Sequence, residues 1–170
     1  FASYGFIAIA IGPNDEINDS HEMRAEGLID AIETIKEEDY RSDSPLFGLV
    51  DHDKFIVSGY SMGGGASQVA LVLDHPYVDE AIVAAIALNP TIIFEDCDIC
   101  SDSEYCICLV PEFLEHDIPT LVIAGQNEIN ELPDYDGLLG QDIYENTPES
   151  TLKILYEIES GGHGSAEVSS

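Results

Sequence analysis

Residues 57–65 read Val-Ser-Gly-Tyr-Ser-Met-Gly-Gly-Gly and place Ser61 at the centre of a Gly-x-Ser-x-Gly motif. The apolar run Phe55-Ile56-Val57 leads into the motif, and an alanine-rich helical pattern follows it. In such a strand–turn–helix context the serine lies on a sharp, strained turn that raises its hydroxyl above the end of a parallel sheet. We expect Gly59 and Gly63 to lie where the crowded backbone leaves no room for a side chain. The stretch therefore predicts a nucleophile elbow rather than an ordinary structural turn.

The segments around the elbow alternate between strand and helix patterns. Continuous apolar runs predict strands at residues 5–11, 55–57, 81–88, 120–124 and 152–158. Helical spacing predicts a covering helix from about Asp19 to Lys36 and a second helix at about residues 64–73. The residues expected to face the sheet are Met23, Leu28, Ile29, Ile32, Ile35, Ala66, Val69, Ala70 and Leu73. Apolar strands that alternate with helices indicate an α/β fold with a mostly parallel sheet covered on both faces.

Two later segments supply the partners that a nucleophilic serine needs. The strand at residues 120–124 runs into Gly125-Gln126-Asn127-Glu128, and the last strand opens into a glycine-rich loop that contains His163. The chain order Ser61, Glu128, His163 is the order found when the serine lies on an elbow of this kind. The pattern predicts that Ser61 attacks an acyl carbonyl and that His163 takes and returns its proton. Glu128 would then fix the imidazole tautomer and stabilise the imidazolium.

Other ionisable residues compete with this assignment. Asp134 and Asp136 follow Glu128 closely and remain alternative acids. The remaining histidines have no comparable placement and are expected at the surface or at helix ends; they are His21, His52, His75 and His116.

Length and composition predict a single domain over residues 1–170. The chain is 45% hydrophobic, so it can bury one core, and it contains no apolar stretch long enough for a spanning helix and no complete signal peptide. The 34 acidic against 5 basic residues give a formal charge of -29. This charge disfavours nucleic acids and anionic membranes as partners. It suits either a high-salt environment or an acidic extracellular protein, and we expect a secreted or extracellular monomer without a cofactor or metal.

A cysteine-rich insertion is predicted at about residues 95–110. The chain's four cysteines, Cys97, Cys100, Cys106 and Cys108, follow a C-x2-C-x5-C-x-C pattern between two predicted strands. Two disulfides are the favoured interpretation for an extracellular protein, with a thiolate metal site or free thiols as alternatives.

Four stretches together resemble the cutinase-like polyesterases of the α/β-hydrolase fold, the group that includes bacterial cutinases and poly(ethylene terephthalate) hydrolases. They are Phe1 to Phe6, Ser44 to Asp51, Gly59 to Gly65 and Glu157 to Ala166. The resemblance implies the same triad, with Glu128 where the family usually has Asp. It also implies that the Met62 backbone N–H is an oxyanion donor and that the Met62 side chain lines the acyl site.

The sequence departs from that family in three places. The family's domain begins before residue 5 and ends with a helix after the His loop, so we expect a fragment that lacks N-terminal strands, an upstream oxyanion donor and that helix. Where the family often has a Trp that stacks on aromatic polyester, this chain has Asn89-Pro90-Thr91, and it contains no Trp. This places Thr91 among the expected substrate-binding residues. The cysteine insertion is the third departure.

These patterns predict a serine carboxylic-ester hydrolase that forms an acyl-enzyme on a neutral, lipid-like or polyester-like ester. The triad does not identify the leaving group, so thioester, lactone or amide cleavage is the alternative chemistry. A non-catalytic hydrolase-like binding module is the alternative from another class. Retention of all three triad members in order argues against it.

Overall fold

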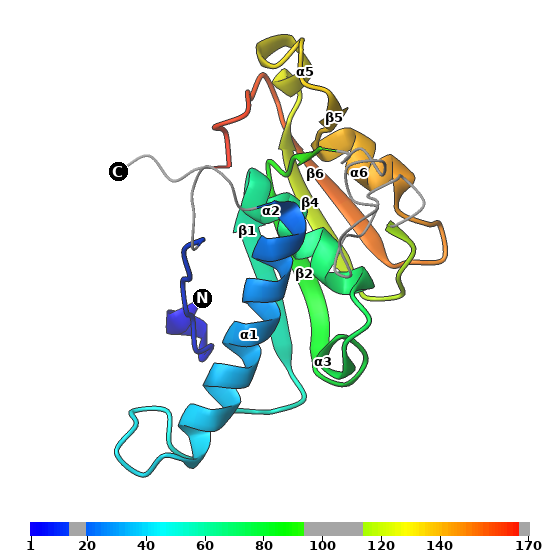
Figure 1. Ribbon diagram of the computed structural model, residues 1–170. Helices are drawn as coiled ribbons and strands as arrows, with labels where there is room; N and C mark the ends of the chain where they lie inside the picture. Colours follow the sequence, from blue (N-terminus) through cyan, green and yellow to red (C-terminus); the bar gives the residue numbers. More distant parts are fainter. Residues whose placement is uncertain (14–19, 94–113, 167–170) are drawn as a thin grey trace.

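A four-stranded sheet with parallel neighbours organises the computed structural model, which describes residues 1–13, 20–93 and 114–166. The strand order is β1-β2-β4-β6, and every adjacent pair is parallel (Figure 1). The strands are β1 Phe55–Tyr60, β2 Ile82–Leu88, β4 Thr120–Gly125 and β6 Lys153–Ile158. Two short strands, β3 Ile92–Ile93 and β5 Gly137–Leu138, form a separate antiparallel pair. β3 follows β2 in the chain, and β5 follows β4. The mostly parallel α/β sheet predicted from the sequence is confirmed.

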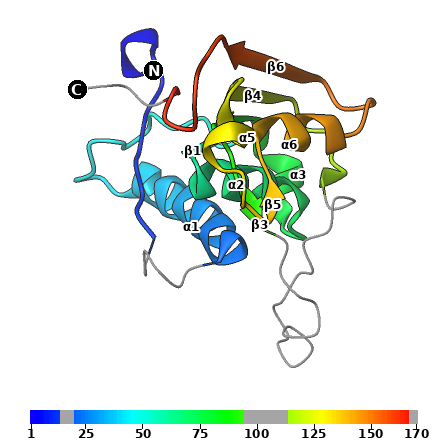
Figure 2. The same cartoon turned by 90° about the horizontal axis from the view of Figure 1, so that it is seen from above.

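In the described part of the chain, one α-helix precedes β1, and the others lie between later strands. The helices are α1 His21–Tyr40, α2 Met62–Val69 with a 3-10 extension Ala70–Val72, α3 Pro76–Glu80, α5 Glu128–Glu131 and α6 Gly140–Asn146. Among the described residues, α1, α2 and α6 lie on the same side of the sheet (Figure 2). The expectation that both faces are covered is not met in the described residues, because Ile56, Ile154 and Tyr156 on the opposite side of the sheet are exposed.

The core forms where α1 and α2 pack against alternate residues of the strands. Ser20 caps the start of α1, because its side chain accepts a hydrogen bond from the Met23 backbone N–H. Ile29 and Ile32 then pack beside Val57 of β1. The inward prediction for Met23 is wrong, since its side chain is 51% exposed. Met23 lies nine positions before Ile32, about two and a half turns, which puts it on the opposite side of the helix from Ile32.

Residues 5–11 do not form the buried strand predicted for them. Ala2–Tyr4 make a 3-10 turn, Gly5 has a left-handed φ of 89°, and the following residues are exposed and extended without strand pairing. The physical reason is that these residues form no hydrogen-bonded ladder with the open outer edge of β1, the edge strand of the described sheet. Within the described residues β1 pairs with β2 on one side, and residues 5–11 pair with neither. Apolar character alone favours burial of a segment, whereas strand structure also needs a neighbouring strand that supplies hydrogen bonds.

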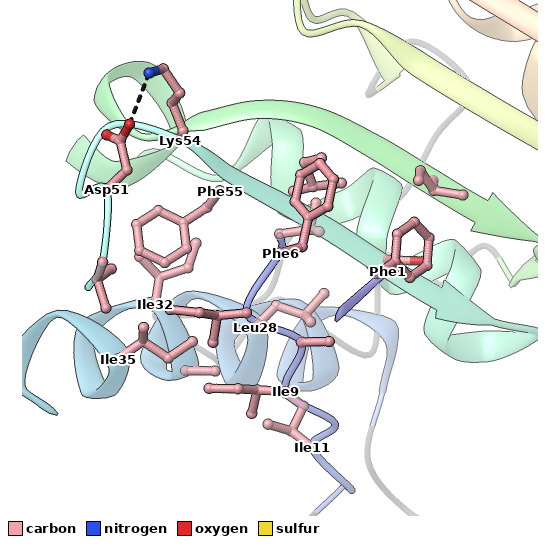
Figure 3. A pocket seen from close by; sticks show the side chains of 18 of the residues that line it. Phe1, Phe6, Ile9, Ile11, Leu28, Ile32, Ile35, Asp51, Lys54 and Phe55 are labelled. Carbon is pink, nitrogen blue, oxygen red and sulfur yellow. Dashed lines mark hydrogen bonds and ion pairs between the residues drawn. The ribbon is translucent and has the colours of Figure 1, made fainter. Parts of the chain in front are cut away.

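An apolar hollow of about 420 Å³ lies between this segment, α1 and β1, and we name it the N-terminal trough (Figure 3). Its lining includes Phe6, Ile9, Ile11, Leu28, Ile35 and Phe55. Asp51 and Lys54, which are 2.8 Å apart between Oδ2 and Nζ, also belong to its lining. Residues 5–11 thus lie beside α1 with a hollow between them and do not join the sheet.

None of the helices in the described part of the chain combines the length and apolar composition needed to cross a bilayer. The predicted insertion at about residues 95–110, with Cys97, Cys100, Cys106 and Cys108, lies outside the described residues.

Candidate active site

Ser61 occupies a strained turn between β1 and α2. Its backbone has φ 55° and ψ -120°, a combination that non-glycine residues rarely adopt. Its N–H donates to Leu88 O at 3.0 Å, and its carbonyl accepts from the N–H groups of Gly65 and Thr91 at 3.0 and 3.1 Å. These bonds tie the turn to α2 and to the chain after β2. The neighbouring structure therefore over-determines the strained conformation, as expected for a nucleophile elbow.

The glycines around Ser61 explain how the turn fits. A Cβ on Gly59 would lie 2.2 Å from the backbone carbon of Gly63, so the prediction for Gly59 is confirmed. The prediction for Gly63 is wrong, because a Cβ there would meet nothing within 4 Å. Gly63 contributes the backbone that crowds Gly59, while its own Cβ direction is open. Gly65 is tight for a separate reason, since its Cβ would lie 2.0 Å from Thr91 O.

The structure brings Ser61, His163 and Glu128 into one hydrogen-bonded row. Ser61 Oγ lies 2.9 Å from His163 Nε2, and His163 Nδ1 lies 3.0 Å from Glu128 Oε1. The three residues come from the ends of β1, β6 and β4, which reach the same edge of the sheet because the strands are parallel. Asp134 and Asp136, the alternative acids, are exposed residues beyond α5. Of the three carboxylates considered from the sequence, Glu128 is the one bonded to His163.

Glu128 is buried, and its two oxygens differ. Its residue exposure is 2%, and Oε1 accepts from Asn89 Nδ2 at 2.7 Å in addition to facing His163. Oε2 is buried without a hydrogen-bond partner in the described part of the chain. A Cβ on Gly140 would lie 3.2 Å from Oε2 and 2.6 Å from the Cβ of Ala124. Glycine at the start of α6 thus leaves room for the longer glutamate side chain.

The loop that carries His163 is fixed from two neighbouring elements. Its backbone N–H donates to Glu131 Oε2 at 2.8 Å, and its carbonyl accepts from the Tyr60 hydroxyl at 3.2 Å. The rings of Tyr60 and His163 lie 5.6 Å apart between centroids. Asn127 N–H also donates to Gly161 O at 2.8 Å. These bonds hold the imidazole over Ser61.

Sequence reasoning missed three residues of this site: Tyr60, Asn89 and Glu131. Weak signals for them exist. Tyr60 directly precedes the serine, and Glu131 lies three residues after Glu128, the spacing that puts two residues on one side of a helical turn. Asn89 follows an apolar strand and precedes Pro90, which marks a turn but not its function.

Met62 and Thr91 lie on either side of the elbow backbone. Met62 is the first residue of α2, a position whose N–H has no partner within the helix. Thr91 is 3% exposed, and its N–H is bonded to Ser61 O. The expectation that Thr91 faces the substrate is thus corrected, because a buried residue beneath the elbow supports the turn instead.

His21 is also part of this support. It begins α1, so it lies at a helix end, one of the two placements expected for it, and it is 2% exposed, which excludes the surface alternative. Its Nε2 lies 2.7 Å from Thr91 O and donates to it, since a carbonyl oxygen accepts only. Burial lowers the pKa of His21 below its ordinary value, which keeps the imidazole neutral at this contact.

A strained serine, a histidine and a buried carboxylate at the carboxyl edge of a mostly parallel sheet define an α/β-hydrolase. Residues 1–97, more than half of the chain, match the family model described as PET hydrolase-like, and the chain belongs to this family. No curated protein matches the chain. The family implies an ester hydrolase of the α/β-hydrolase type. The matched residues include Ser61 and end before Glu128 and His163, so the grouping of these two with the serine comes from the geometry.

Proposed function

We propose that the protein is a serine carboxylic-ester hydrolase in which Ser61 is the nucleophile, His163 the general base and acid, and Glu128 the orienting carboxylate. The observation that supports this proposal is the continuous row from Ser61 Oγ to His163 Nε2 and from His163 Nδ1 to Glu128 Oε1, with both separations at or below 3.0 Å. The family match, which covers Ser61 but neither Glu128 nor His163, supports the same class of reaction.

The row assigns the protons. An ionised Glu128 carboxylate can accept hydrogen bonds but cannot donate them. Its bond to His163 therefore places the hydrogen on Nδ1 and leaves the lone pair of Nε2 toward Ser61. As Ser61 Oγ bonds to the acyl carbon, its proton moves to Nε2 and the carbonyl π electrons move to oxygen. The imidazolium then protonates the departing alcohol, which leaves an acyl-enzyme. Water repeats the sequence and releases the acid.

The negative oxygen of the tetrahedral intermediate needs hydrogen-bond donors. The Met62 N–H begins α2 directly after Ser61, so it is available as one oxyanion donor and has the helix dipole behind it. We assign Met62 this function through its backbone. Tyr60, 37% exposed beside Ser61 and His163, is suited to form a wall of the substrate site.

A neutral ester is the substrate class that this chain best accommodates. The formal charge of -29 repels anionic substrates. The family points toward polyester-like substrates, and the exposed aromatic ring beside the serine offers an apolar contact to the acyl part.

Hydrolysis of p-nitrophenyl esters with short and medium acyl chains tests the proposal. The parent protein should release p-nitrophenol, and Ser61→Ala should lower the rate by about 10⁴-fold or more because no other group replaces the nucleophile. Ser58→Ala is the matched control, since Ser58 is an exposed serine on β1 outside the row. A fluorophosphonate probe should label the parent and not Ser61→Ala. Labelling that survives Ser61→Ala would refute the assignment.

A further inference from the structure

Asn89 lies at the end of β2, where three separate segments of the active site converge. It is completely buried and has a left-handed φ of 39°. Its backbone N–H donates to Ile123 O at 2.7 Å, which anchors it to β4. Asparagine adopts left-handed conformations more readily than most residues, yet such a position in a buried non-glycine residue is uncommon. The bond to β4 and the left-handed backbone together set the direction in which the side chain leaves the chain.

The two ends of the Asn89 amide bond to different parts of the site. Nδ2 donates to Glu128 Oε1 at 2.7 Å, and Oδ1 accepts from the Ala166 N–H at 2.7 Å. Nδ2 also lies 3.3 Å from Gly162 O and 3.5 Å from Ser165 Oγ. One side chain thus connects the acid to the loop on both sides of His163.

These partners fix the chemistry required at position 89. An ionised carboxylate only accepts and a backbone N–H only donates, so the orientation of the amide is determined by its neighbours. A carboxylate at this position could accept the hydrogen bond from the Ala166 N–H, but it could not donate to Glu128 unless it were protonated. An apolar residue could make neither of these two hydrogen bonds.

Glu128 depends on this bond because its other oxygen is unsupported. Oε2 is buried with no hydrogen-bond partner in the described residues, so the hydrogen bonds that stabilise the anion converge on Oε1. A donor to a buried carboxylate favours its charged form. The charged form is the one that holds the His163 tautomer.

We propose that Asn89 is a positioning residue that keeps Glu128 ionised, aims its Oε1 at His163 and fastens the His163 loop to the end of β2. This inference rests on the proposed triad. It goes beyond it by adding a fourth residue that acts on the reaction through Glu128 and not by contact with the substrate.

Other ionisable groups around this point belong to four elements. Glu128 and Glu131 come from α5, His163 from the loop after β6, and Tyr60 from β1. On the α1 side His21 contacts Thr91 O, two residues from Asn89. The elements α2 and α6 approach the neighbouring Pro90 with Gly64 and Gly140, which carry no charge. A pH test at position 89 therefore reports first on Glu128 and His163.

The test measures the rate of labelling by a fluorophosphonate probe in the protein and its variants between about pH 5 and pH 8, where histidine titrates. In labelling, Ser61 Oγ bonds to phosphorus, fluoride leaves and the proton passes to His163. Asn89→Ala removes the donor and should lower the rate by about 10- to 100-fold, the value of a hydrogen bond to a charged group. Because Glu128 then protonates more easily, this loss should be largest at acid pH and shrink as pH rises.

Asn89→Asp should show the opposite trend. It has nearly the same shape and tolerates a left-handed φ, which keeps the test valid if Asn89→Ala does not fold. Its carboxyl donates to Glu128 only while protonated, and two adjacent carboxylates repel each other when both ionise. Its loss relative to the parent should therefore grow from pH 5 to pH 8. Asn146→Asp, an exposed amide-to-acid change at the end of α6, is the matched control and should follow the parent.

The outcomes separate the two proposals. Ser61-dependent labelling with opposite pH trends in Asn89→Ala and Asn89→Asp supports the positioning role. Ser61-dependent labelling with losses that do not vary with pH would overturn it, because a purely mechanical tether loses rate equally at every pH, and would leave the triad intact. Labelling that does not depend on Ser61 would refute the triad itself, and with it the function given to Asn89.

Discussion

At the carboxyl edge of the sheet, Asn89 and Glu128 are buried and bonded across the ends of three strands, whereas in the N-terminal trough Phe6 and Ile9 are about half exposed on a segment without strand pairing. The first region consists of polar residues and the second of apolar residues, yet the polar region is the more completely packed. Hydrogen bonds specify one partner and one direction, while an apolar run packs against any surface nearby. Hydrophobicity alone therefore did not decide which segment of this chain became fully packed.

The largest expected effect lies in the carboxyl edge. Glu128→Gln keeps the shape of the acid but removes its charge, so the imidazole loses its tautomer control and its stabilising anion. The rate of ester hydrolysis should fall by about 10³- to 10⁴-fold with little change in melting temperature. Asp136→Asn makes the same chemical change at an exposed position and should leave the rate unchanged. Equal losses from both substitutions would mean that Glu128 is not the acid.

A smaller effect concerns the close packing of the elbow. Gly59→Ala places a Cβ 2.2 Å from the Gly63 backbone and should cost about 3 kcal/mol or more in the free energy of unfolding. Gly63→Ala meets nothing within 4 Å and replaces a helical glycine, so it should be neutral or stabilising by up to about 1 kcal/mol. Urea denaturation of both variants measures the difference. A Gly63→Ala variant as unstable as Gly59→Ala would contradict the described crowding.

The next effect tests the trough directly. Ile32→Ala removes a 3% exposed side chain from the core and should destabilise the protein by about 2–4 kcal/mol. Ile9→Ala makes the same truncation on a 50% exposed side chain and should cost less than about 1 kcal/mol. Chemical denaturation compares the pair. If Ile9→Ala were as costly as Ile32→Ala, residues 5–11 would be as well packed in solution as the core between α1 and β1.

The smallest expected effect is that of salt, which screens exposed charges strongly and buried charges little. Because a chain with a formal charge of -29 repels itself, its melting temperature should rise by a few degrees between low salt and about 1 M NaCl. The ratio of the labelling rates of the parent and Glu128→Gln should stay constant over the same range, since salt screens a buried pair little. A melting temperature that is flat or falls with salt would contradict adaptation to high salt.

Local patterns in the sequence predicted much of the fold and of the proposed active site. The elbow serine follows from strand, glycines and helix in direct succession, and parallel strand order brings Glu128 and His163 to the same edge. Each of these inferences needs only the position of a residue relative to its own strand. The strands predicted around them are confirmed with small changes in their ends, except for residues 5–11.

What the sequence could not give are contacts between segments that are distant along the chain. Asn89 is separated from Glu128 by 39 residues and from Ala166 by 77, so no local spacing reveals that it joins them. The unpaired state of residues 5–11 depends likewise on which strand edge lies beside them. The sequence by itself determined the type of each element and the order of the reactive residues, because these follow from local periodicity. Only the tertiary structure decided which side chains support them, since burial and hydrogen-bond partners exist only once the strands stand side by side.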